Sequence, residues 1–319
     1  MPDNDTSARR SSTLRNSLVL GIGALAGSAI LSSALAFQAE RTNPPTGRFV
    51  VVDGVRLHYV DYGEGDPVVF FHGNGSMIQD LACSGLLDQA AAHHRVIAFD
   101  RPGFGHSERP SDRRWGPSEQ AALFDKALTE MGVRSAIIVG HSWGTLVALA
   151  LALDHPDHVK RLILLSGYYF PSLRADTALS APGATPLLGS LLQHTIGPVI
   201  GWLMSTSAVE HMFKPRAVPD AFWQAYSIGL ANRPSQLKSA ATETVAMPFA
   251  AAALAQRYTE LRMPVAIIAG SDDAIVDTGS QSARLHDQIV GSTFESVSGV
   301  GHMVHHAVPE KIVRTLDRA

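Results

Sequence analysis

A serine between small residues is the strongest chemical signal in the chain. Ser142 lies at the centre of residues 140–144, whose sequence Gly-His-Ser-Trp-Gly matches the pattern G-x-S-x-G. A buried apolar strand is expected at residues 136–139 and a helix from about Trp143, which is the context that this pattern requires. The turn between them is so sharp that small residues must flank the serine. We therefore interpret Ser142 as a candidate nucleophile.

Attack by a serine needs further groups. A serine hydroxyl is a poor nucleophile near neutral pH, so a histidine must take its proton as the oxygen attacks a carbonyl. A buried carboxylate holds that histidine in the correct tautomer and stabilises the imidazolium. The backbone N–H of Trp143, at the start of a helix, can stabilise negative charge on the substrate.

From Arg48 onward the chain alternates strands with helices. Two expected strands, at residues 49–52 and 56–61, flank Asp53-Gly54, which is a hairpin signal. Later runs are apolar at consecutive positions, as in strands buried on both faces of a parallel sheet: residues 68–71, 96–99, 136–139, 162–165 and 265–269, with a last strand near 294–297. Helices are expected at residues 78–92, 117–131, 143–154 and 279–289, and from about Pro309. This pattern predicts an α/β fold with a mostly parallel eight-stranded sheet flanked by helices and antiparallel at its start.

The alternation stops between Phe170 and Met263. That stretch is too long for a loop and is rich in large apolar residues, so we expect a helical insertion between two strands of the sheet. The expected domain organisation is a core at residues 48–170 and 263–319 and a helical lid at residues 171–262.

Further motifs carry a resemblance to a known superfamily. His72-Gly73-Asn74-Gly75 follows the third strand, residues 100–107 read Asp-Arg-Pro-Gly-Phe-Gly-His-Ser, and Gly270-Ser-Asp-Asp273 and Gly301-His302 follow later strands. With the serine motif, these residues resemble the α/β-hydrolase superfamily over residues 48–319. The resemblance implies a catalytic triad of Ser142, Asp273 and His302, in the chain order found in this fold. It also implies an oxyanion hole made by the backbone N–H groups of Asn74 and Trp143.

Several neighbouring residues have other interpretations. Asp272 is adjacent to Asp273, but the family's G-x-x-D spacing favours Asp273, and Asp272 is expected to cap the turn or face solvent. His72 is expected to be a structural partner of the oxyanion loop, and His141 to fill space behind the serine. His305 and His306 are interpreted as surface or site-rim residues.

Composition excludes several classes of function. Charged residues make up 17% of the chain and the net charge is −3, so nucleic-acid binding is not expected. The single cysteine, Cys83, excludes an internal disulfide. The pairs His93-His94 and His305-His306 lack the i, i+4 spacing of helical metal ligands, and no G-x-G-x-x-G follows a first strand. No metal and no organic cofactor are predicted.

The first residues are expected to lie outside the globular fold. Residues 1–16 are polar and contain Arg9, Arg10 and Arg15, whereas residues 18–37 contain no charge and as a helix would span roughly 30 Å, one bilayer core. We expect a cytoplasmic basic N-terminus at residues 1–16, a membrane anchor or signal peptide at 17–37 and a linker at 38–47. The preceding arginines predict that the catalytic part lies on the outer side. The small-x-small sequence at 34–36 leaves cleavage and secretion as the alternative.

The nucleophile narrows the expected activity. Relatives in the resembled superfamily that open epoxides or displace halide use an aspartate where this chain has Ser142. A carboxylester hydrolase acting on an apolar acyl substrate is the leading interpretation. A C–C bond hydrolase, a perhydrolase, an acyltransferase or a non-catalytic binding protein of the same fold are the alternatives.

One prediction separates the two aspartates. Asp273→Asn should lower the kcat of ester hydrolysis by orders of magnitude, because the histidine would be held in the wrong tautomer. Asp272→Asn is the matched control and should retain most of the activity. Steady-state kinetics on a short-chain ester would measure both variants, and the reverse result would transfer the acid's role to Asp272.

Overall fold

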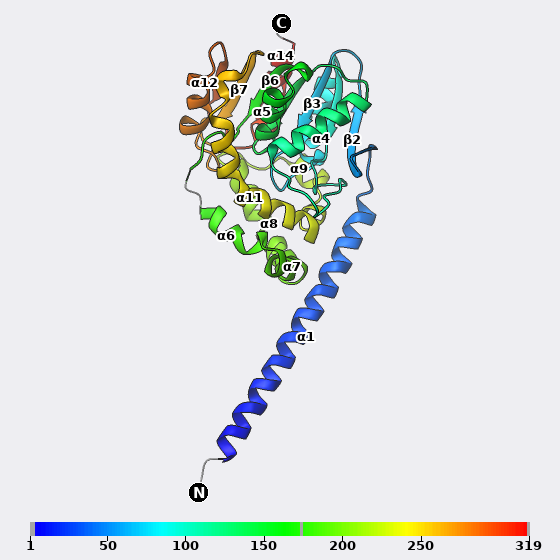
Figure 1. The fold of residues 1–319 in the computed structure, drawn as a ribbon, viewed down its shortest axis with the longest axis vertical. Helices are drawn as coiled ribbons and strands as arrows, with labels where there is room; N and C mark the ends of the chain where they lie inside the picture. Colours follow the sequence, from blue (N-terminus) through cyan, green and yellow to red (C-terminus); the bar gives the residue numbers. More distant parts are fainter. Residues whose placement is uncertain (1–3, 173–174, 318–319) are drawn as a thin grey trace.

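The computed structural model describes residues 4–172 and 175–317, except the side chains of residues 4–18, 22, 175 and 186. Eight strands form one sheet in the order β1-β2-β4-β3-β5-β6-β7-β8 (Figure 1). Strand β2 runs antiparallel to both of its neighbours, β1 and β4, and all other neighbouring strands run parallel, so the sheet is mostly parallel and antiparallel at its start, as predicted. The strands are β1 Arg48–Val52, β2 Val55–Tyr62, β3 Pro67–Phe71, β4 Arg95–Phe99, β5 Ala136–His141, β6 Val159–Leu165, β7 Val265–Gly270 and β8 Thr293–Val297.

Helices cover both faces of the sheet, because the central strands are apolar on consecutive positions and so present buried side chains to each side. One apolar cluster packs the sheet against α4 (Pro117–Glu130), α5 (Gly144–Asp154) and α12 (Arg284–Gln288). A second cluster packs the other face against α2 (Ile78–Cys83), α3 (Leu86–Ala91), α13 (Val304–Ala307) and α14 (Pro309–Leu316). The result is a three-layer α/β structure.

Two expected helices differ from the structure. The helix expected at residues 78–92 is broken into α2 and α3, because Gly85 adopts a φ of 75° and this left-handed conformation interrupts the right-handed helix. The helix expected at residues 279–289 begins as a π-helical turn, Gly279–Ala283, and continues as α12.

The described part of the chain between β6 and β7 is mostly helical. It contains α6 (Ala175–Ala184), α7 (Pro186–His194), α8 (Gly197–Phe213), α9 (Asp220–Ala225), α10 (Ile228–Ala231) and α11 (Pro234–Ala255). Figure 1 shows these helices gathered at one end of the sheet, with α11 between the sheet and α6–α8. We refer to residues 171–262 as the lid, the name of the predicted segment.

A long helix precedes the sheet. The helix α1, Asn4–Thr42, projects from the lid end of the molecule (Figure 1). It continues five residues into the expected linker at 38–47, so the non-helical connection to β1 begins only at Asn43. The stretch Val19–Thr42 is long and apolar enough to cross a membrane, and most of its described side chains are exposed. The side chains of the basic N-terminus at 1–16 lie outside the described residues.

Candidate active site

Ser142 lies on a sharp turn between β5 and α5. Its φ is 52°, a left-handed conformation that is uncommon for a residue with a Cβ. The turn brings backbones so close that a Cβ on Gly144 would lie 2.3 Å from the carbonyl oxygen of Phe71. A Cβ on Gly140 would lie 2.6 Å from the carbonyl oxygen of Gly144. The two glycines of the motif are therefore required by backbone packing.

The structure brings together the three side chains that the sequence singled out. The Ser142 Oγ lies 2.9 Å from Nε2 of His302, and Nδ1 of the same ring lies 2.8 Å from Oδ2 of Asp273. The side chains of His302 and Asp273 are 5% and 1% exposed, so the pair is shielded from water. Because a carboxylate only accepts hydrogen bonds, Nδ1 carries the proton and Nε2 is free to accept from the serine hydroxyl. The arrangement matches a nucleophile, a base and an orienting acid.

The backbone after β7 holds Asp273 in place. The N–H groups of Ile275 and Val276 both donate to Oδ1 of Asp273 at 2.9 Å, which leaves Oδ2 for the histidine. Asp272 is exposed and accepts hydrogen bonds from the Ser271 hydroxyl and from the N–H of Gly299. Asp272 therefore braces the turn and points away from the histidine, as expected.

The loop after β3 lies against the serine turn. His72 is fully buried; its Nδ1 donates to the Gly73 carbonyl oxygen and its Nε2 accepts from the N–H of Arg101. Burial, and then the positive charge of Arg101, lower the pKa of His72 to about 3, so the ring stays neutral. A Cβ on Gly73 would lie 3.1 Å from Cβ of Ser142, which shows how closely the loop approaches the serine.

The two predicted oxyanion donors fit that role. Within the described part of the chain, no acceptor is found for the backbone N–H of Asn74 or of Trp143. The Asn74 side chain donates to the Ala240 carbonyl oxygen and the Thr244 hydroxyl of α11, at 3.1 and 2.8 Å. The lid thus fixes the side chain of the residue whose N–H is a predicted donor to negative charge.

The histidines around the site correct one expectation. His305 and His306 are not rim residues: their side chains are 0% and 3% exposed, and both Nε2 atoms lie within 3.2 Å of Oδ1 of Asp80 in α2. Adjacent histidines can reach one oxygen because that oxygen belongs to a helix packed beside them. His141 fills the space behind the serine, as expected, and its Nε2 donates to the His302 carbonyl oxygen at 3.1 Å.

The same cluster offers a possible ligand set. One ligand atom from each of Asp80, His305 and His306 lies within 4.8 Å of the others, so these residues could hold a metal ion. The two histidines therefore cluster with a carboxylate without i, i+4 spacing, because the third group comes from another helix. Burial lowers the pKa of His305. Burial would raise the pKa of Asp80, but the contacts with His305 and His306 outweigh this effect and hold that pKa well below its usual value. The absence of a metal stays a prediction.

Comparison with known proteins identifies the family. The profile described as alpha/beta hydrolase fold matches residues 66–307. The chain belongs to the α/β-hydrolase fold family.

Most of the curated relatives align with only part of this α/β-hydrolase. A 2-hydroxymuconate semialdehyde hydrolase of Pseudomonas putida is 35% identical over 156 residues, which is 48% of this chain and 54% of the relative. The chain thus aligns with about half the length of that relative. An (E)-2-((N-methylformamido)methylene)succinate hydrolase of Acinetobacter baylyi is 25% identical over 80% of this chain and 90% of its own.

Solved structures agree on the fold. Cfl2 from Burkholderia cenocepacia is 23% identical with a TM-score of 0.68, covering 84% of this chain and 93% of its own. A membrane phospholipase A is 19% identical with a TM-score of 0.60, covering 97% of this chain and 96% of its own. At these identities the likeness shows the fold alone. The second alignment includes most of α1, since 97% coverage leaves too few residues unaligned to omit that helix.

A buried ion pair that the sequence did not predict links the lid of the α/β-hydrolase to the site. Arg101, in the loop after β4, is 0% exposed and pairs with Glu243 of α11 through two contacts of 2.7 and 3.0 Å. Arg101 also donates to the carbonyl oxygens of His72 and Gly73 and lies over the Trp143 ring. In the sequence, Glu243 is distinguished only as the one acidic residue of α11. That observation does not indicate which residue it pairs with.

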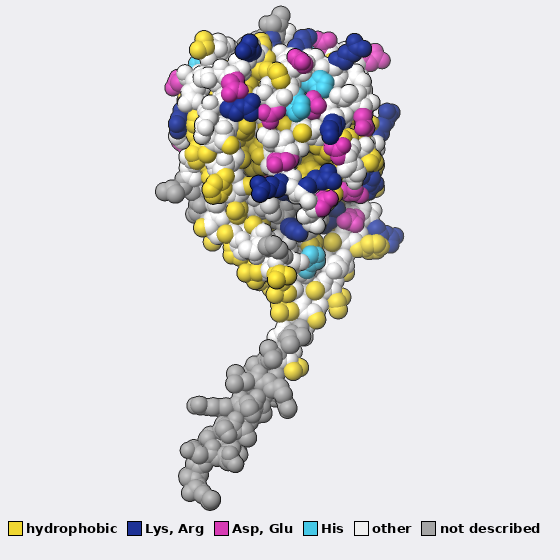
Figure 2. All heavy atoms as spheres, viewed as in Figure 1, with side chains coloured by type: hydrophobic (Ala, Val, Ile, Leu, Met, Phe, Trp, Pro, Cys, Tyr) yellow, Lys and Arg dark blue, Asp and Glu magenta, His cyan; other side chains and the backbone are white. Residues whose placement is uncertain are grey.

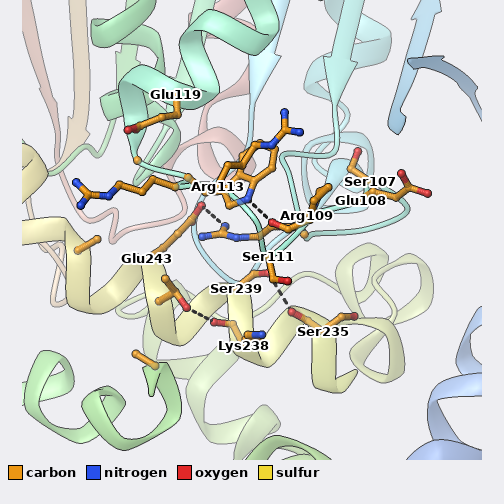
Figure 3. A pocket seen from close by; sticks show the side chains of 18 of the residues that line it. Ser107, Glu108, Arg109, Ser111, Arg113, Glu119, Ser235, Lys238, Ser239 and Glu243 are labelled. Atoms are coloured by element: carbon orange, nitrogen blue, oxygen red, sulfur yellow. Dashed lines mark hydrogen bonds and ion pairs between the residues drawn. The ribbon is translucent and has the colours of Figure 1, made fainter. Parts of the chain in front are cut away.

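A cleft lined by many charged and polar side chains lies apart from the serine. It measures about 1580 Å³ and lies between the loop after β4 and α11. Figure 3 shows Arg109 and Glu243 directed toward each other, with Lys238 on α11 and Glu119 and Arg113 on the opposite wall. Neither Ser142 nor His302 belongs to its lining, so this cleft is separate from the serine site. No sequence pattern predicted this cleft.

The buried ion pair generates a stability prediction. Glu243→Gln should lower the free energy of unfolding by roughly 3–5 kcal/mol, because Arg101 would keep its charge without a buried counter-ion. Glu119→Gln, an exposed glutamate of the same cleft, is the matched control and should change it by less than about 0.5 kcal/mol. Urea unfolding in a mild detergent would measure both, and equal effects would refute the importance of the pair.

Proposed function

We propose that this protein is a serine hydrolase that cleaves carboxylic esters through an acyl-enzyme intermediate. The observation that carries the proposal is the hydrogen-bonded chain from Ser142 Oγ through His302 to Asp273, with links of 2.9 and 2.8 Å. The distances lie within hydrogen-bond reach, so a proton can move without rearrangement. The roles of the three residues below belong to this proposal.

In the first half-reaction, Ser142 Oγ attacks the ester carbonyl carbon while its proton passes to Nε2 of His302. The oxygen of the tetrahedral intermediate becomes negative and accepts hydrogen bonds from the N–H groups of Asn74 and Trp143. Asp273, ionised beside the ring, stabilises the imidazolium. His302 then gives the proton to the departing alcohol, and an acyl-serine remains.

Water completes the reaction. His302 removes a proton from a water molecule, whose oxygen attacks the acyl carbon, and the proton returns to Ser142 as the carboxylic acid leaves. The His302 backbone must stay in place through both steps, because its ring accepts and releases one proton in each half-reaction. His141 supports it by donating to its carbonyl oxygen.

We further propose that α1 is retained as a single membrane anchor, with the catalytic domain on the outer side. Two observations support retention over cleavage: Ser28 donates to the Thr195 carbonyl oxygen of the lid at 2.6 Å, and Ser32 is buried. Removal of residues up to 36 would expose lid surface that Ser28 and Ser32 now cover. The basic residues that precede the apolar segment support the orientation.

A C–C bond hydrolase is the second candidate. It is favoured by the relative named 2-hydroxymuconate semialdehyde hydrolase, which is 35% identical over about half of each chain. The same serine, histidine and aspartate would serve that reaction. Relatives named haloalkane dehalogenase are also similar, over 38% of this chain. Ser142 argues against halide displacement, which in the family uses a carboxylate nucleophile.

The nucleophile can be tested directly. Ser142→Ala should lower kcat for a short-chain ester to less than about a hundredth of wild type and abolish labelling by a fluorophosphonate probe. The fold should persist, because alanine keeps the Cβ at the same backbone position.

Ser111→Ala is the control, since this exposed serine lines the polar cleft of Figure 3. It should keep both activity and labelling. Labelling of the Ser142→Ala variant would contradict the assignment, and an unlabelled wild type would favour a non-catalytic protein. Turnover of a vinylogous 1,5-diketone but of no ester would favour the second candidate.

A further inference from the structure

The lid carries a large apolar surface that faces outward. On α7 and α8 the exposed fractions are 89% for Leu187, 66% for Trp202, 67% for Leu203 and 61% for Met204. Figure 2 shows apolar side chains gathered at the end of the globular part from which α1 leaves. Contiguous apolar surface of this kind marks a contact with a partner or a membrane.

Composition and shape favour a membrane as the partner. Residues 177–209 contain no Asp, Glu, Lys or Arg. The helices α7 and α8 together are long and apolar enough for a membrane span, but they bend by 67° where they meet. The far end of α8 returns to the core, since Val209 and Phe213 are buried against Phe222 and Met303. The pair therefore forms an elbow that leaves the domain and comes back, and cannot cross a bilayer.

The position of α1 sets the depth of this elbow. Thr195, between α7 and α8, accepts the hydrogen bond of Ser28, which lies nine residues before Phe37 near the end of the apolar segment. Nine residues of helix rise about 14 Å, and about 10 Å remain along the membrane normal if α1 tilts by roughly 40°. If the apolar segment of α1 occupies the bilayer, the elbow must enter the same leaflet.

We propose that the elbow Pro186–Phe213 inserts beside α1 into the leaflet of a phospholipid bilayer that faces the catalytic domain. Exposed leucine and tryptophan side chains then lie among the acyl chains and lipid headgroups. The lid would present the site to molecules already dissolved in that leaflet. Resting on the proposed ester hydrolysis, this identifies the substrate class as acyl esters of membrane lipids.

Trp202 reports insertion without any need for activity. The full chain would be reconstituted into phosphatidylcholine vesicles with and without bromine on the acyl chains, and wild type compared with Trp202→Phe. Trp115 and Trp143 are 8% and 1% exposed and belong to the packed core, and Trp223 of α9 is 39% exposed. All three are present in both proteins, so the difference between wild type and variant isolates Trp202. The Trp202 emission, taken as the difference between wild type and variant, should be quenched at least twofold by brominated lipid. Emission that brominated lipid leaves unchanged and aqueous acrylamide quenches would overturn insertion.

A charge on the elbow tests the substrate class. Leu203→Glu should lower hydrolysis of phospholipid or acylglycerol esters in vesicles at least tenfold and change hydrolysis of a soluble acetyl ester less than twofold. Val290→Glu is the control, because Val290 is fully exposed on the surface of the sheet domain, between α12 and β8 and outside the lid. This variant should change neither rate. Equal vesicle rates for Leu203→Glu and wild type would overturn entry from the leaflet. If wild type hydrolyses no ester while Trp202 is quenched, the proposed function fails and insertion stands.

Discussion

The charge of Arg101 is the constraint on which the site's surroundings depend. A guanidinium with no exposure to water is costly unless its donors are paired, and here the partners come from the lid and from the loop after β3. Glu243 supplies the counter-charge from the lid, and the carbonyl oxygens of His72 and Gly73 accept from the same group. The need to satisfy one cation thus fixes the lid, the loop after β3 and the loop after β4 relative to one another.

The fold was largely predictable because its signals are local. A strand buried on both faces is apolar at every position, and each expected strand of the sheet appears within three residues of its predicted bounds. The serine turn was predictable for the same reason: Gly140 and Gly144 are required by close backbone approach within a few residues. Asp273 and His302 were placed by resemblance, and they meet because parallel strands end at one edge of the sheet.

The parts that sequence did not predict rest on pairs distant in the chain. Arg101 and Glu243 are separated by 142 residues, and Asp80 and His305 by 225. No periodicity links such residues, and each alone has an ordinary interpretation as a solvated charge or a surface histidine. Only packing of α11 on the loop after β4, and of α13 on α2, reveals that these side chains are buried together.

The lid helix α11 connects the proposed membrane anchor to the proposed oxyanion hole. It begins beside Arg233, which pairs with Glu40 of α1 at 2.8 Å. Thr244 lies eleven residues further along, about 16 Å at the rise of an α-helix, and holds the side chain of Asn74. Because a helix is stiff over this length, displacement of α1 relative to the core would move the groups that hold the Asn74 loop. An α1 held by a bilayer and packed on the lid therefore restrains the N–H that would stabilise the reaction's negative charge. The position of the anchor and the geometry of the site are in this way one mechanical unit.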